Sequence, residues 1–257
     1  MPSKLQNEGV FAIVAAMALA ALVACGQTVR TEVFVARAEK AFAGAWQKFQ
    51  SDTNSADAAC EFGRASSELA ELATNDTQRA EVARRGIAVC RQLLAKEPDS
   101  APGHYYLAMN LGQLAQADAP SLTAYRLVHE VEHEFKTAAA LDVRLDYGGP
   151  ARTLGLLYYQ APGWPLSVGS KSKAREWLER AATLAPDYPE NQLNLAEAQL
   201  KWRERKKLEA TLKKLDAIWP VARTNLTGEA WQESWQEWDS RRAALKADYR
   251  RIYAAKP

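Results

Sequence analysis

The segment from Lys173 to Pro220 reads KAREWLERAATLAPDYPENQLNLAEAQLKWRERKKLEATLKKLDAIWP and indicates how the chain folds. Its first half contains Ala174, Leu178, Ala181 and Pro186, which follow one another at spacings of 4, 3 and 5 residues. Spacings of three and four residues place side chains on one face of a helix, and a proline is typical of a helix end. Another proline, Pro220, follows Pro186 by 34 residues. The segment therefore predicts a helical unit that repeats every 34 residues.

This pattern resembles the tetratricopeptide repeat (TPR), in which small residues let two helices approach and a proline closes the second helix. The same register recurs at Gly86, Cys90 and Leu93 before Pro98, and less regularly at Val131, Phe135 and Ala138. The resemblance covers residues 55–220 and implies an all-α, right-handed solenoid of about five helical hairpins. We expect this solenoid to form a single domain over residues 33–257.

The rest of the chain is also helical in pattern, with no alternating strand pattern. Residues 31–50 have helical periodicity, and segments 55–73 and 77–99, and then 101–116 and 121–142, form pairs separated by turn residues. We expect a C-terminal helix over about 228–254. One face of this helix carries an apolar seam that is interrupted at Arg242 and consists of Trp231, Trp235, Trp238, Leu245, Tyr249 and Ile252. Such a seam favours a helix that caps the open end of a solenoid, and a partner helix is the alternative.

One hairpin contains extra residues. Ala174 follows Gly155 by 19 residues, where a TPR needs about 12, so APGWPLSVGS at 161–170 is an inserted loop. Prolines keep either helix from extending into the loop, and glycines permit its turns. The loop either presents Trp164 and Pro165 as a binding face or folds Trp164 over the core as a plug.

The N-terminus resembles a bacterial lipoprotein signal. Lys4 precedes an apolar run too short to span a bilayer, and Leu22-Val23-Ala24-Cys25 resembles a lipobox. We expect a signal peptide over 1–24, a lipid on Cys25 and a tether over 25–32. Gly26 favours the outer membrane of the bacterial envelope, with the domain facing the periplasm. An uncleaved signal anchor, or a signal with a coincidental cysteine, is the alternative.

Composition narrows the function classes. Hydrophobic residues make up 47% of the 257, enough for a sizeable core, and the formal net charge is only +2. Basic residues are interspersed with acidic ones, which argues against nucleic acid as a partner. The sequence has no phosphate-binding glycine loop and no nucleophile elbow, and we expect no cofactor.

A narrower resemblance is to the T-component of TRAP transporters, a family of lipid-anchored periplasmic TPR proteins. It rests on the order of the lipobox, the irregular hairpins, GGPARTLGLLYYQAPGWPLSVGS at 148–170 and LAPDYPENQLNLAE at 184–197. This resemblance implies that the protein docks a periplasmic solute-binding protein. It is also compatible with a homo-oligomer around a pore, and it implies no catalytic residues. A generic envelope scaffold that binds proteins or peptides is the alternative.

An enzyme is the rival hypothesis. His129, Glu130 and His133 spell H-E-x-x-H, the pattern of a zinc hydrolase, in which both imidazoles share one helix face. The repeat register opposes it because Val131 and Phe135 occupy the buried positions and turn the histidines outward. We therefore expect a non-enzymatic protein with a solvated, ion-paired face here.

Two further groups of residues are candidates, one for a ligand-binding surface and one for a disulfide. One helix begins with His104, Tyr105 and Tyr106 and continues to Asn110; these side chains line a concave ligand surface or simply start a helix. Cys60 and Cys90 lie equally far from the turn at Asn75, at the same height in a hairpin, yet on different helix faces. A disulfide between them is one interpretation, and two small buried thiols the other.

Overall fold

The computed structural model describes residues 32–119 and 121–253, and its regular structure there is helical throughout. The α-helices are α2 (Glu32–Ser51), α3 (Ala56–Glu71), α4 (Asp76–Lys96), α5 (Ala101–Ala117), α6 (Leu122–Leu141), α7 (Leu145–Gln160), α8 (Lys171–Leu184), α9 (Pro189–Lys201), α10 (Arg205–Asn225) and α11 (Gln232–Tyr253). A short 3-10 helix, η1 (Glu229–Trp231), leads into α11.

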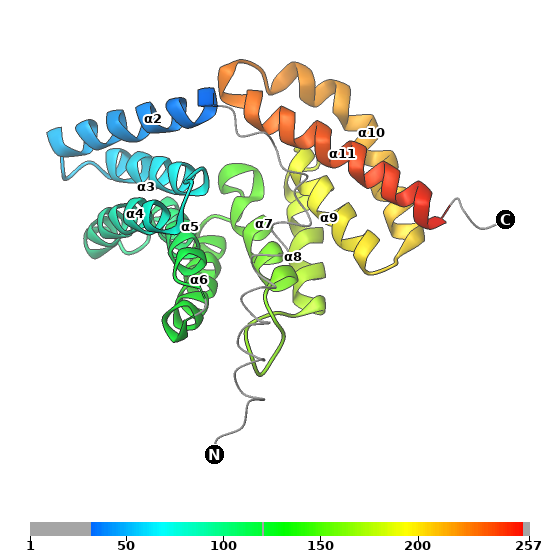
Figure 1. The fold of residues 1–257 in the computed structure, drawn as a ribbon, viewed down its shortest axis with the longest axis horizontal. Helices are drawn as coiled ribbons and strands as arrows, with labels where there is room; N and C mark the ends of the chain where they lie inside the picture. Colours follow the sequence, from blue (N-terminus) through cyan, green and yellow to red (C-terminus); the bar gives the residue numbers. More distant parts are fainter. Residues whose placement is uncertain (1–31, 120, 254–257) are drawn as a thin grey trace.

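The helices form consecutive antiparallel hairpins that stack along a curved array (Figure 1). The hairpins are α3/α4, α5/α6, α7/α8 and α9/α10, preceded by α2 and followed by α11. Each hairpin packs mainly on its neighbours along the chain, as expected of a solenoid. The predicted all-α solenoid is confirmed, with four hairpins among the described residues rather than five.

Polar residues start the helices where the sequence places its breaks. The side-chain oxygen of Ser55, Asn75, Ser100, Ser121 and Ser170 each accepts a backbone N–H from the first turn of the helix that follows. These caps satisfy donors that have no partner inside the helix. The hairpin boundaries are therefore set by local chemistry.

The repeat register is confirmed by burial and by close helix approach. The predicted small or apolar positions on the second helices are all buried: Gly86, Cys90, Leu93, Val131, Phe135, Ala138, Ala174, Leu178 and Ala181. On the opposing first helix, a Cβ added to Gly155 would lie 2.7 Å from Cγ of Leu178 and 2.9 Å from its backbone N. Only glycine lets α7 approach α8 this closely.

Pro220 does not close a helix, contrary to the prediction. It lies inside α10, which continues to Asn225. Trp219, Ala222 and Leu226, around and beyond the proline, are buried in the same core cluster as α11. Packing against the C-terminal helix carries α10 past a residue that disfavours helix interiors.

The predicted C-terminal cap is confirmed. Trp235, Trp238 and Leu245 of α11 are buried against α9 and α10, and Trp231 and Tyr249 pack at the edge of the same cluster. Arg242, which interrupts the seam, lies over the ring of Trp219 and pairs with Asp216. The open end of the array is thus covered by aromatic side chains.

The predicted signal peptide over 1–24, the predicted lipidation site Cys25 and the predicted tether up to residue 31 lie outside the described residues. Within the described part of the chain, every helix is too short or too polar to cross a bilayer.

Candidate binding site

The inserted loop has a hydrogen-bonded base. The Gly169 N–H donates to the Pro162 carbonyl at 2.8 Å, and the Ser170 N–H donates to the Tyr158 carbonyl at 2.9 Å. A Cβ on Gly169 would lie 1.9 Å from the Ala161 carbonyl oxygen, so this crossing requires glycine. Ser167 is buried, and Ser170 caps α8. The base of the loop is therefore fixed by its own backbone.

The tip of the loop points away from the core. Trp164 is 89% exposed, and Pro165 and Leu166 beside it are also exposed. The plug hypothesis is therefore wrong, since a plug would bury the indole. The Leu166 and Ser167 N–H groups both donate to the Gly163 carbonyl, which holds the chain in a tight turn beneath the tryptophan.

The tip also touches the start of α6. The Tyr125 hydroxyl donates to the Pro165 carbonyl at 3.0 Å. One turn before Tyr125, Leu122 is 84% exposed. The loop and the first turn of α6 together form a surface with exposed apolar side chains, which we call the tip surface: Leu122, Trp164, Pro165 and Leu166.

The candidate residues of α5 are mostly interior. Asn110 is fully buried and donates to the carbonyls of Gly63 and Tyr106, and Tyr105 is buried with its hydroxyl donating to Asp146. Both support packing between helices, so neither lines a concave surface. Tyr106 is half-buried, and burial together with the Asp146 charge raises its pKa to about 12.

His104 fits the simpler interpretation, a residue of the first turn of a helix. Its Nδ1 lies 2.5 Å from Oε2 of Glu134 on α6, and its Nε2 lies 2.8 Å from the Pro98 carbonyl oxygen. The imidazole therefore ties α5 to α6 and to the preceding turn.

A buried arginine organises the start of α7, which the sequence pattern did not reveal. Asp146, Tyr147 and Gly148 have φ values of 48°, 56° and 79°, in the left-handed region. The Arg152 guanidinium holds this turn by donating to the Asp146 carboxylate at 2.7 Å, and it lies 3.6 Å from the Glu190 carboxylate. Burial opposes its charge, but Glu190, Tyr105 and Asp146 outweigh burial and raise the pKa of Arg152.

The same turn exposes an aromatic ring. Tyr147 is 45% exposed and stacks on Tyr188, the residue just before α9, with ring centroids 4.6 Å apart. Trp231 meets both rings edge-on. The dipeptide Gly148-Gly149, followed by Pro150, was the available sequence signal of an unusual turn here.

Comparison with solved structures identifies the fold. A thermophilic TPR protein of Thermus thermophilus, TTC0263, superposes with a TM-score of 0.56 at 16% identity, covering 83% of this chain and 91% of that one. This chain has the TPR fold. PilF of Pseudomonas aeruginosa is also similar, with a TM-score of 0.30 at 17% identity, covering 76% of this chain and 93% of that one. No protein-family model and no curated protein matches the sequence.

In the TPR solenoid, the H-E-x-x-H residues lie on the polar face of α6. His129 and His133 are exposed, whereas Val131 and Phe135 are buried, as the register predicted. The Glu130 carboxylate accepts from Arg91 of α4 at 2.6 Å. Within residues 32–119 and 121–253, no three His, Cys, Asp or Glu side chains are placed to hold a metal ion.

The two cysteines of the solenoid are free thiols, not the disulfide that was one interpretation. Cys90 is fully buried on α4, and a Cβ on Gly63 of α3 would lie 2.6 Å from its sulfur. Cys60 is half-buried, where burial raises the pKa of its thiol to about 11. The sulfur of Cys90 thus occupies the space that glycine leaves between the helices.

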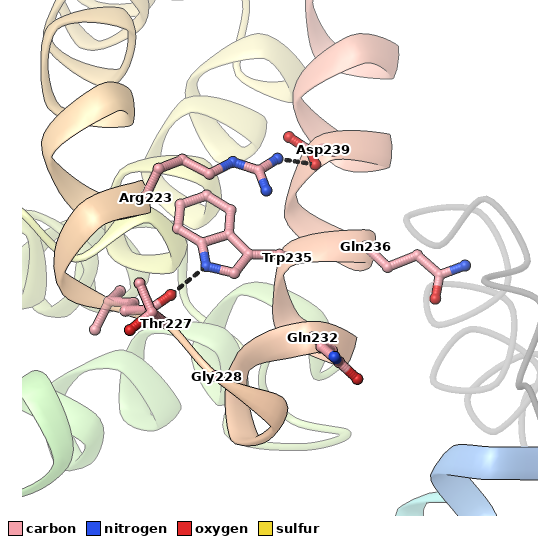
Figure 2. Close-up of a pocket in the computed structure, with 8 residues that line it drawn as sticks. Arg223, Thr227, Gly228, Gln232, Trp235, Gln236 and Asp239 are labelled. Carbon is pink, nitrogen blue, oxygen red and sulfur yellow. Dashed lines mark hydrogen bonds and ion pairs between the residues drawn. The ribbon is translucent and has the colours of Figure 1, made fainter.

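An open hollow of about 430 Å³ lies between the end of α10 and the start of α11 (Figure 2). Arg223 lies over the Trp235 ring, with its guanidinium carbon 4.2 Å from the ring centroid, and pairs with Asp239. The Trp235 indole N–H donates to the Leu226 carbonyl at 2.6 Å. Because its charged groups pair with each other, this hollow has the character of a structural junction.

Proposed function

We propose that the chain is a non-enzymatic TPR adaptor of the bacterial envelope, anchored to a membrane by a lipid on Cys25, that binds a protein partner through the tip surface. One observation carries the binding role: Trp164 is 89% exposed at the end of a loop whose base is held by hydrogen bonds. A solenoid hairpin closes without these extra residues, so packing does not require them.

The tip surface has the properties of a protein-binding element. Tryptophan is over-represented among the residues that dominate interface energies. A loop already fixed at its base loses little conformational freedom when it binds. Leu122 and Leu166 extend the apolar area around the indole. A protein with an apolar depression is the partner that this chemistry fits.

The position of the loop also favours a protein partner over the membrane surface. The start of α2 and the inserted loop lie at opposite edges of the molecule (Figure 1). Glu32 follows Cys25 by seven positions, a stretch that reaches at most about 24 Å when extended. A lipid at Cys25 would therefore hold the α2 edge near the bilayer and direct Trp164 toward the periplasm.

The finer proposal is a T-component role in a TRAP transporter, with a periplasmic solute-binding protein as the partner. The order of the lipobox, the irregular hairpins and the inserted loop supports it. A homo-oligomer is compatible with this role. A general envelope scaffold for proteins or peptides is the second candidate. Identifying the protein that co-purifies with the chain distinguishes these two functions.

The test of binding uses Trp164→Ala beside a control, Val221→Ala, which removes an exposed apolar side chain of α10. We expect Trp164→Ala to weaken binding of a co-purifying protein by about 2 kcal/mol or more, and Val221→Ala to leave it unchanged. A partner that binds both variants like wild type would overturn the role of the tip surface.

The anchor has its own test. Cys25→Ala should leave the precursor uncleaved and unlabelled by fatty acid, while the wild-type chain is labelled and fractionates with the outer membrane. Fatty-acid labelling that persists in Cys25→Ala would place the anchor elsewhere.

A further inference from the structure

An arginine joins the two ends of the described solenoid. Arg37 of α2 donates to the Glu229 carbonyl at 2.5 Å and to Oε1 of Gln232 at 3.1 Å. Its guanidinium also lies 3.9 Å from the Glu229 carboxylate. Arg37 is separated from these two acceptor residues by 192 and 195 positions in the chain, so the contact joins the first described helix to the last.

This contact closes the array into a ring. In Figure 1 the start of α2 lies beside the segment that links α10 to α11, and the start of α7 lies inside the curve between them. Partly or well exposed side chains on the first helices of the hairpins include Glu68, Tyr106 and Tyr147. The Glu68 side chain is 56% exposed but has protein on several sides, and this crowding, followed by the Asp146 charge, raises its pKa. Burial and the same charge raise the pKa of Tyr106, so these groups from α3, α5 and α7 lie near one another.

The closure differs in kind from the contacts that hold α2 in place. Phe42, Trp46 and Phe49 of α2 pack around Phe62 of α3 in an apolar cluster. Arg37 instead makes polar contacts with acceptors that water also reaches, because the Glu229 side chain is 84% exposed. Exposed ion pairs contribute little to stability and are screened by salt. Because each unit of a solenoid contacts mainly its neighbours, small rotations between units change its curvature.

We propose that Arg37 is a salt-sensitive latch that holds the solenoid in a closed ring and releases it to an open arc. The latch depends neither on the lipid at Cys25 nor on the partner bound at the tip surface.

Small-angle X-ray scattering of the mature chain tests the latch. We expect the radius of gyration of wild type to increase by about one tenth between about 0.05 M and about 0.5 M salt, as the terminal helices move outward. Arg37→Ala and Arg37→Glu should have the larger radius at low salt already. Arg251→Ala, which removes an exposed arginine paired within α11, should behave like wild type.

Two further measurements keep the test decisive. Arg37→Lys, which keeps the positive charge and an N–H donor, should keep the smaller radius at low salt, and slow hydrogen exchange in α2 should show that the helix stays attached. If the radius of gyration of the wild-type chain does not change with salt, the latch proposal is overturned, whatever the variants show. Arg37→Ala and Arg37→Glu variants that retain native helicity and scatter like wild type would also overturn it.

Discussion

Two tryptophans of this chain occupy opposite environments. Trp164 is 89% exposed at the tip of the inserted loop, whereas Trp238 is 1% exposed inside the C-terminal cap. The ring of Trp238 meets those of Tyr188, Trp235 and Trp231 at centroid distances of 5.4, 5.0 and 6.0 Å. Trp164 has no comparable ring contact among the described residues.

The difference follows from what each part of a solenoid requires. An end hairpin exposes apolar surface unless another element covers it, so α11 must bury large side chains there. A turn between two helices of one hairpin has no such need. Burial therefore explains the aromatic residues of the cap, but it does not explain the one at the tip.

The largest effect is expected in the cap. Trp238→Ala leaves a cavity among three aromatic rings and should lower the free energy of unfolding by about 3 to 5 kcal/mol. Urea unfolding followed by circular dichroism measures this loss. A loss below about 1 kcal/mol would mean that α11 does not cover the core as described.

A smaller loss is expected where α7 meets α8. Gly155→Ala places a Cβ within 3 Å of the Leu178 side chain and backbone N and should cost about 1 to 3 kcal/mol, because the two helices must separate. Gly44→Ala is the control, since a Cβ there meets nothing within 4 Å. It should stabilise α2 by about 0.5 to 1 kcal/mol through its better helix propensity. Equal effects at both glycines would contradict the close helix approach.

The sequence predicted the hairpins well because their signals are local. Apolar periodicity, caps such as Asn75 and Ser100, and the small residues at Gly155 and Ala174 all act within one hairpin. The length of the inserted loop also followed from the repeat register. Whether Trp164 turns in or out did not, since its neighbours in sequence are compatible with either direction.

Contacts between distant residues were the part that could not be predicted. Arg152 meets Glu190 only after α7, α8 and α9 have packed, and the continuation of α10 past Pro220 depends on α11. Asn110 looked like a ligand-binding residue because a polar side chain in an apolar helix has no visible partner. The structure supplies one, the Gly63 carbonyl of a neighbouring hairpin.

Acid should weaken the contact between α6 and α7 near the loop. Glu132 accepts from Lys136 and from the Tyr158 hydroxyl, each at 2.6 Å. Burial alone would raise the pKa of Glu132, but these hydrogen bonds and the charges of Lys136 and Lys173 lower it. Because the folded pKa lies below the unfolded value, this stability is present above the unfolded pKa and is lost as pH falls through the folded pKa.

Glu132→Gln removes that titration and keeps an acceptor for Tyr158. Between about pH 5 and pH 3, wild type should lose more stability than Glu132→Gln. Urea unfolding at a series of pH values measures the difference. Parallel curves for the two proteins would show that Glu132 has the same pKa in the folded and unfolded chain.

The smallest stability effect is expected at the tip. Trp164→Ala should change the free energy of unfolding by no more than about 0.5 kcal/mol, because an indole that is 89% exposed buries almost nothing on folding. Gly169→Ala is the informative companion, since its Cβ would collide with the Ala161 carbonyl and reshape the loop while leaving the indole in the sequence. Both variants should bind the partner poorly, the first for lack of the anchor and the second because the anchor is misplaced. A Trp164→Ala variant destabilised by more than about 2 kcal/mol would mean that the indole packs on the core in solution, and the contrast with Trp238 would then disappear.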